Sequence, residues 1–143
     1  MKTKVSDILR SKGHDIWSIG PDAAIIDALR LMAEKRIGAL LVMDGEKLVG
    51  IFSERDYARK VALEDRSSRT SKVRDIMSTR VLCAKPEQTV EECMALMTDK
   101  RARHLPILEH KKVVGVVSIG DLVKAIINEQ QHEIEQLQYY ITH

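Results

Sequence analysis

Residue types that carry specialised chemistry are scarce in this chain of 143 residues. Aromatic residues make up only 3% of it, which argues against a surface on which nucleic-acid bases stack. The formal net charge is +2, from 23 basic and 21 acidic residues. That balance is too even for the concentrated basic face of a nucleic-acid-binding protein, so we expect no nucleic-acid partner.

Cysteines and long apolar runs are also scarce. The two cysteines, Cys83 and Cys93, match no zinc-ligand spacing and are too few for a disulfide framework, which favours two buried thiols in a reducing compartment. No run approaches the ~18 apolar residues of a membrane span. The N-terminal segment M-K-T-K-V-S-D-I-L-R-S-K lacks the apolar core of a signal peptide. We therefore expect a soluble, cytoplasmic protein without a membrane partner.

Signatures of catalysis are missing as well. The sequence contains neither the phosphate-binding loop G-x-x-x-x-G-K-[ST] nor the dinucleotide motif G-x-G-x-x-G. Its five histidines stand in no Ser/His/Asp or metal-ligand order. We therefore expect no catalytic residues, no metal site and no enzymatic activity. The 44% hydrophobic and 31% charged residues are nevertheless typical of a soluble globular protein.

An internal repeat organises the chain. Residues 17–60 align with residues 82–125 at a constant offset of 65 without a gap, and eleven of the 44 positions are identical. A shorter echo precedes each copy, V-S-D-I-L from Val5 and V-R-D-I-M from Val73. The identical pairs include Gly50 and Gly115, Ser53 and Ser118, and Asp56 and Asp121.

Each copy predicts the element order β-α-β-β-α, and hence an α/β fold. An extended stretch ends at a proline, and a helix follows whose apolar residues have the i, i+3, i+4, i+7 spacing of one buried stripe. In the second copy Thr89 and Glu92 have the spacing of a capping box. Two apolar strands joined by a turn then predict a hairpin, expected to be buried on both faces. The stripes are Ile25, Ala28, Leu29 and Met32, and Val90, Cys93, Met94 and Met97.

We expect the first repeat over residues 1–63, a Ser- and charge-rich linker over 64–72, the second repeat over 73–127 and a helical extension over 128–143. One repeat would be marginal alone, and packing two together supplies the missing burial. Ile127, Ile134 and Ile141 recur every seven residues, with Leu137 beside them. This stripe is too short to assert a coiled coil. It favours packing back on the repeats or against a second copy in a homodimer.

In their order and duplication these segments resemble the cystathionine-β-synthase (CBS) domain in its tandem form, the Bateman module. The resemblance covers about residues 5–127. It rests on V-x-D-I-M, x-P-x-x-T-V-x-E-x-x-x-x-M, H-L-P-I and G-V-V-S-x-x-D in the second copy. It implies two CBS folds packed through their sheets with pseudo-twofold symmetry. It also implies two clefts that hold adenosine nucleotides, AMP first, with ATP, NAD(H) or S-adenosylmethionine as alternatives.

The repeated S-x-x-D motif has two interpretations. Ser followed by an acidic residue three positions later is a capping-box pattern, worth about 1 kcal/mol without any ligand. Three residues after the capping serine a capping box usually has Glu or Gln, whereas both copies have Asp. The resemblance instead assigns Asp56 and Asp121 to the ribose hydroxyls, assisted by Ser53 and Ser118. The two roles are compatible, since Ser can cap the helix while Asp binds.

The resemblance places the nucleotide phosphates beside the residues that precede the central strand. In the second copy these are Arg103 and His104. In the first copy Gly38 replaces the arginine, which leaves Arg36 and Arg55 as the nearest cations. A solvated face is the alternative for each arginine. The two sites are therefore expected to be chemically unequal.

An adenine ring needs a flat apolar slot with a few backbone hydrogen bonds. For the apolar residues at the family positions of this slot, ordinary core packing is the alternative interpretation. The positions implied are Ser18, Ile37, Ala39, Cys83 and Ala102, with Phe52 and Val117 closing the slot.

Two functions from different classes follow. In the first, the chain is a regulatory module for energy or redox sensing, whose nucleotide occupancy alters a separate enzyme or transporter, or its own dimer. In the second, it is a structural dimerisation module in which S-x-x-D only caps helices.

Overall fold

Two β-hairpins, one from each repeat, have the same register. Strand β2 (Ala39–Asp44) pairs antiparallel with β3 (Lys47–Ser53), and β4 (His104–Glu109) pairs in the same way with β5 (Lys112–Ser118). The register shifts after the fourth residue of the first strand in both hairpins. Such a bulge is a specific local feature, so its recurrence shows that the repeat detected in the sequence is a structural repeat.

The computed structural model describes residues 3–142. The first two residues of the expected first repeat and the last residue of the expected extension lie outside this range. The described chain forms two compact units. The hairpin-1 unit comprises Ile16–Leu82, and the hairpin-2 unit comprises the residues up to Asp15 together with those from Cys83 onward.

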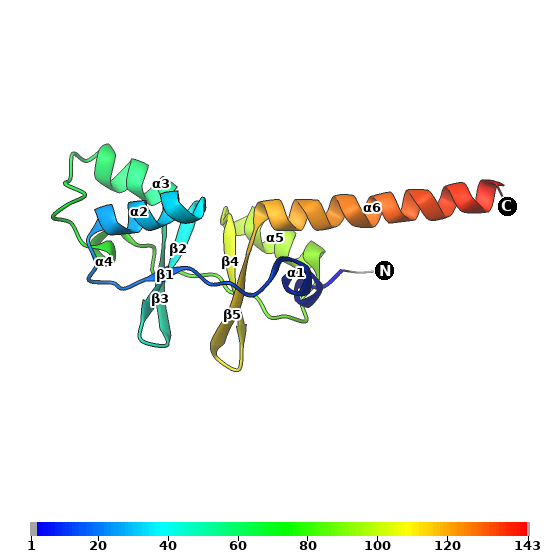
Figure 1. Cartoon of the computed structure of the whole chain (residues 1–143), viewed down its shortest axis with the longest axis horizontal. Coiled ribbons are helices and arrows are strands. Elements are labelled where there is room, and N and C mark those ends of the chain that lie inside the picture. The colour runs from blue at the N-terminus through cyan, green and yellow to red at the C-terminus, as the bar shows by residue number, and fades with distance from the viewer. Residues whose placement is uncertain (1–2, 143) are drawn as a thin grey trace. The chain divides into compact units, whose positions relative to one another are not determined.

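The hairpin-1 unit is built around β2 and β3 (Figure 1). Strand β1 (Ser18–Ile19) pairs parallel with β2. Helix α2 (Ile25–Lys35) connects these strands, and the short α3 (Glu54–Asp56) continues into a π-helix, η1 (Tyr57–Ala62). Helix α4 (Val73–Ile76) completes the unit.

The hairpin-2 unit contains α1 (Val5–Lys12), α5 (Val90–Lys100) and the 24-residue α6 (Ile119–Thr142). Here the extended stretch before α5 makes a single parallel bridge, between Ala84 and Ile107. The predicted order of one strand, a helix, two strands and a helix is thus reproduced in the first copy, whereas in the second the first strand is reduced to this bridge. The α/β fold class is confirmed.

The short V-x-D-I helices are exchanged between the repeats. Helix α1 precedes the first repeat in sequence but lies in the hairpin-2 unit, whereas α4 precedes the second repeat but lies in the hairpin-1 unit. Matching hydrogen bonds hold them. The amide of Val5 donates to the carbonyl of Gln88 at 2.9 Å, and the amide of Val73 donates to that of Ala23 at 2.9 Å. Each compact unit therefore combines two segments that are distant in the sequence of the repeats.

Each of the two helical stripes predicted from the sequence is buried at three of its four positions. Leu29 and Met94 are only half-buried. In the hairpin-1 unit the buried stripe joins strand and helix residues in one apolar core. Its buried members are Ile25, Ala28, Met32, Leu40, Val42, Phe52, Val61, Val73 and Ile76.

The expectation that both hairpin strands are buried on both faces holds only for the first strand of each hairpin. Three consecutive residues are buried in β2 and in β4, whereas burial in β3 and β5 alternates toward the end of the strand. Alternation of this kind is typical of a strand with one more accessible face.

The first backbone amides of α5 and α2 find their hydrogen-bond acceptors in different ways. The predicted capping box is present, because the amide of Glu92 donates to Thr89 Oγ1 at 3.2 Å and Thr89 Oγ1 donates to Glu92 Oε1 at 3.1 Å. Helix α2 begins after Ala24 and has no such side chain. Its first amides donate instead to the linker carbonyls of Ser68 and Ser71, at 2.8 and 3.0 Å. The linker therefore supplies the acceptors that a helix start requires.

Candidate functional site

Both S-x-x-D motifs lie where the second strand of a hairpin passes into a helix. Ser53 stands opposite Ala39, and Ser118 stands opposite His104. The backbone amide after each serine donates to the carbonyl of the residue that precedes the first strand of its hairpin. These carbonyls belong to Gly38 in one unit and Arg103 in the other, at 3.0 and 2.9 Å. Each hairpin therefore gathers the predicted ribose and phosphate residues of its own copy at one end, here called the S-x-x-D end.

Asp56 is held by three hydrogen-bond donors and one ion pair. Its Oδ2 accepts the amide and the hydroxyl of Ser53, both at 3.0 Å, while the Asp56 amide donates back to Ser53 Oγ at 3.1 Å. Its Oδ1 accepts Ser78 Oγ at 3.3 Å and lies 3.4 Å from Lys60 Nζ. The side chain is only 13% exposed. The capping interpretation of this motif is therefore correct, although the carboxylate also serves partners beyond the cap.

Asp121 is capped in the same way but has a different cation. Its Oδ2 accepts the Ser118 amide at 2.8 Å, and its own amide donates to Ser118 Oγ at 3.1 Å. The same Oδ2 accepts Lys12 Nζ at 2.7 Å. Lys12 is the last residue of α1 and also donates to the Val116 carbonyl at 2.9 Å.

The environment of Asp121 keeps it charged. Burial opposes ionisation, but the hydrogen bonds from Lys12 and from the Ser118 amide outweigh it, so the pKa of Asp121 lies below its usual value. At neutral pH the group is a carboxylate that can only accept hydrogen bonds. That is the chemistry needed to bind a ribose diol, whose two hydroxyls are donors.

The predicted phosphate residues differ in their accessibility. Arg36, Arg55 and Arg103 are exposed, and His104 is half-buried at the start of β4. Arg36 ends α2 in a left-handed conformation, with φ of 56°. None of the three arginines forms an ion pair with another residue in the range 3–142. Their guanidinium groups are thus accessible to an anionic ligand.

The predicted adenine residues fall into two classes. Ser18 is exposed and pairs with Leu41, while Cys83 and the three alkyl residues at or just before the first hairpin strands are half-buried. Burial raises the pKa of the Cys83 thiol. Phe52 and Val117 are fully buried, with 0% exposure. A ligand reaches these two side chains only if the structure opens, so their core-packing role is the one that the structure supports. The half-buried alkyl residues are Ile37, Ala39 and Ala102.

Sequence reasoning missed three side chains that contact the carboxylates. Lys60 follows Asp56 by four residues, a spacing that places both on one helical face, so this contact was detectable. Ser78 and Lys12 reach their carboxylates from the segments around α4 and α1. Nothing in the local pattern signals those contacts.

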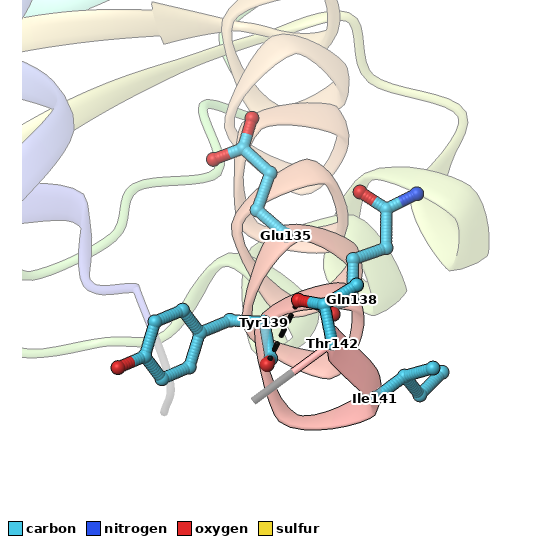
Figure 2. Close-up of a pocket in the computed structure, with 5 residues that line it drawn as sticks. All are labelled: Glu135, Gln138, Tyr139, Ile141 and Thr142. Atoms are coloured by element: carbon cyan, nitrogen blue, oxygen red, sulfur yellow. Dashed lines mark hydrogen bonds between the residues drawn. The ribbon is translucent and has the colours of Figure 1, made fainter.

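Other kinds of site find no support in the described residues. Residues 3–142 contain no cluster of His, Cys, Asp or Glu that could hold a metal ion. Within the same range no helix has both the length and the apolar character needed to cross a membrane. A shallow hollow lies on the last turns of α6, where Tyr139 and Ile141 project to different sides (Figure 2). All five residues around it come from this single helix, so it is a surface hollow rather than a ligand site.

Comparison with known proteins matches both repeats. The family model for the CBS domain matches residues 5–63 and 73–128. The mitochondrial CBS domain-containing protein CBSX3 of Arabidopsis thaliana is 39% identical over 149 positions, covering 97% of this chain and 72% of that protein. The solved structure of a protein with CBS domains from Burkholderia ambifaria MC40-6 is 50% identical, with a TM-score of 0.87 over 90% of this chain and 96% of that one. CBSX2 in complex with AMP shares the fold at 23% identity and a TM-score of 0.73, over 90% and 98%.

Proposed function

Because the chain belongs to the CBS-domain family and carries two CBS domains in tandem, we propose that it is a non-catalytic regulatory module that binds adenosine nucleotides. The observation that carries the proposal is the duplicated S-x-x-D end. In each unit it places a capped carboxylate beside the residues that precede the first hairpin strand. A second structural fact supports it: Arg36 and Arg103, which precede the hairpins, and Arg55, within the first S-x-x-D motif, form no ion pair within the described chain.

In this proposal Asp56 and Asp121 accept the ribose hydroxyls, and the cations at the same ends meet the phosphates. Charged groups give the strongest hydrogen bonds to both parts of a nucleotide. AMP is the ligand that we test first, because CBSX2, a more distant protein of the same fold, forms a complex with AMP. ATP, NAD(H) and S-adenosylmethionine are the other ligands to compare. The protein would act on a separate enzyme or transporter in the cytoplasm, where Cys83 and Cys93 stay reduced.

Thermal denaturation with added nucleotide tests the proposal. We expect AMP at 100 times its dissociation constant to raise the free energy of unfolding by about 2.7 kcal/mol. The double substitution Asp56→Ala and Asp121→Ala should abolish this stabilisation, because both ribose acceptors are lost. Glu92→Ala is the matched control, since it removes the same capping position from α5 without touching either S-x-x-D end.

The alternative function predicts a different result. If the S-x-x-D motifs only cap helices, none of the four ligands stabilises the wild-type protein, and each Asp→Ala substitution costs about 1 kcal/mol, as the Glu92→Ala control does. That outcome would identify a structural module. Stabilisation that persists in the double variant would place the ligand elsewhere.

We further propose that the protein forms a homodimer through α6. From Gln130 onward every described residue of this helix is exposed, and Figure 1 shows these turns continuing past α1 and α5. An isolated helical segment of about 13 residues is only marginally stable in water. Ile134, Leu137 and Ile141 nevertheless expose 47–84% of their surface.

A second copy of α6 is the partner that fits this stripe. Ile127, Ile134 and Ile141 occupy the a position of a heptad and Leu137 occupies the d position. Isoleucine at a with leucine at d favours a pair of helices. Tyr140 stands at the flanking g position and can bury roughly 200 Å². These residues thus form one apolar face of α6 that a second copy of the helix would bury.

Sedimentation velocity tests the α6 pairing. We expect the wild-type protein to sediment as a dimer and Ile134→Lys to sediment as a monomer, because two ammonium groups would face each other in the apolar seam. Gln136→Lys adds the same charge to an exposed position off the seam and should leave the dimer intact. A wild-type monomer, or a dimer that tolerates Ile134→Lys, would rule out this interface.

A further inference from the structure

The carboxylate that the proposed function assigns to the ribose in the hairpin-2 unit is already bound by an internal cation. Lys12 Nζ lies 2.7 Å from Asp121 Oδ2, on the oxygen that also accepts the Ser118 amide. The side chains of Lys12 and Asp121 are 39% and 24% exposed. This is a shorter contact than the 3.4 Å that separates Lys60 from Asp56. The two ribose acceptors are therefore not equally available.

The Lys12 ammonium is held by more than one contact. Its ammonium donates to a second acceptor, the Val116 carbonyl, at 2.9 Å. Leu9, one turn earlier on α1, is almost fully buried and packs against Gly115. After the helix, His14 Nδ1 donates to the Val114 carbonyl at 2.7 Å. Contacts on both sides of Lys12 thus hold α1 along β5, so the ammonium is positioned at Asp121 before any ligand binds.

We propose that Lys12 makes the Asp121 site select phosphorylated adenosine ligands over uncharged nucleosides. This inference rests on the proposed function, because it takes Asp121 as the ribose acceptor. A ribose diol must share Asp121 with the ammonium or displace it. Displacement separates a partly buried ion pair, which is costly unless the cation finds another anion. A phosphate supplies that anion through charge-assisted hydrogen bonds, whereas an uncharged nucleoside does not.

Other candidate cations at the same end add to this selection. Arg103 is exposed, and its carbonyl accepts a hydrogen bond from the first amide of α6. His104 pairs with Ser118 in the hairpin. The released ammonium would join these cationic candidates around one anion. In the hairpin-1 unit the corresponding positions are Gly38 and Ala39, and a neutral hydroxyl, that of Ser78, shares Asp56 with Lys60. We therefore expect stronger selection at the Asp121 site, because Lys12 lies closer to its carboxylate than Lys60 does to Asp56.

Calorimetric titration of AMP and of adenosine tests this inference. The protein carries Asp56→Asn so that only the Asp121 site is measured, and thermal denaturation confirms that each variant is folded. With Lys12 present, AMP should bind more tightly than adenosine. Lys12→Met should lower the ratio of the adenosine to the AMP dissociation constant at least about tenfold, mostly by tightening adenosine. Lys124→Met removes the same charge from an exposed part of α6 and should leave the ratio unchanged, and Lys12→Arg should largely retain it.

The possible failures are distinguishable. If AMP binds to the Lys12→Met protein with an unchanged ratio, Lys12 is only a structural ion pair and the inference is wrong, while the proposed function stands. The same conclusion follows if the Asp56→Asn protein binds no AMP although the wild-type protein does, because the Asp121 site is then not a nucleotide site. If the wild-type protein binds neither compound, the proposed function fails and this inference fails with it.

Discussion

The substitution Phe52→Ala is expected to lower the free energy of unfolding by about 3–5 kcal/mol, the range found when a buried aromatic side chain is truncated. Phe52 has 0% exposure and belongs to the core of the hairpin-1 unit, with Ile25, Met32 and Leu40 around it in the same cluster. Its removal loses the transfer free energy of the ring and leaves a cavity between strand and helix. Urea denaturation followed by circular dichroism measures the loss.

The same residue decides between core packing and a role in the adenine slot. Phe52→Leu keeps most of the apolar volume and should cost less than about 1.5 kcal/mol, so AMP binding can be measured on a folded protein. We expect affinity close to that of the wild type. Ile37→Ala, at a half-buried position of the same unit, should cost less stability than Phe52→Ala. A small stability loss in Phe52→Ala together with abolished binding would instead assign Phe52 to the ligand.

The repeat, the fold class and the secondary structure could be predicted because they depend on local patterns. Val90, Cys93 and Met97 repeat with helical spacing and are buried on one face of α5. The paired Gly50 and Gly115 were visible as identical positions, and the structure gives their reason, since a short V-x-D-I segment packs against each glycine. The S-x-x-D cap was equally local, because its donor and acceptor lie three residues apart.

The contacts that distinguish the two sites could not be predicted, because they join segments that are distant in sequence. Lys12 and Asp121 are separated by 109 residues, and their contact depends on the placement of α1 in the hairpin-2 unit. Hydrophobic periodicity specifies which face of a helix is buried, but not which unit the helix joins. Phe52 and Val117, placed at the adenine slot by resemblance alone, had core packing as their other interpretation, and their full burial supports it.

The docking of α4 leads to the second large effect. Gly50→Val is expected to lower the free energy of unfolding by about 3 kcal/mol, at the upper end of the usual cost of overpacking. A Cβ at Gly50 would lie 2.7 Å from Met77 Sδ and 2.9 Å from the Ser78 carbonyl oxygen. The thioether can rotate away, but the carbonyl accepts the Ile51 amide at 3.0 Å and cannot move without breaking that bridge. Differential scanning calorimetry or urea denaturation detects the change.

Gly50→Val should also change ligand binding at the Asp56 site, which a loss of stability alone would not do. Displacing Ser78 withdraws the hydroxyl that donates to Asp56 Oδ1 at 3.3 Å, so AMP affinity at the Asp56 site should change while binding at Asp121 does not. Gly115→Val is the matched comparison, because the three atoms nearest to its Cβ would belong to the Leu9 side chain, from 2.6 Å, rather than to backbone. It should affect the Asp121 site instead. Gly20→Ala, with nothing within 4 Å of the added Cβ, should be nearly neutral. Equal stability losses at Gly50 and Gly20 would show that α4 does not pack on β3 as described.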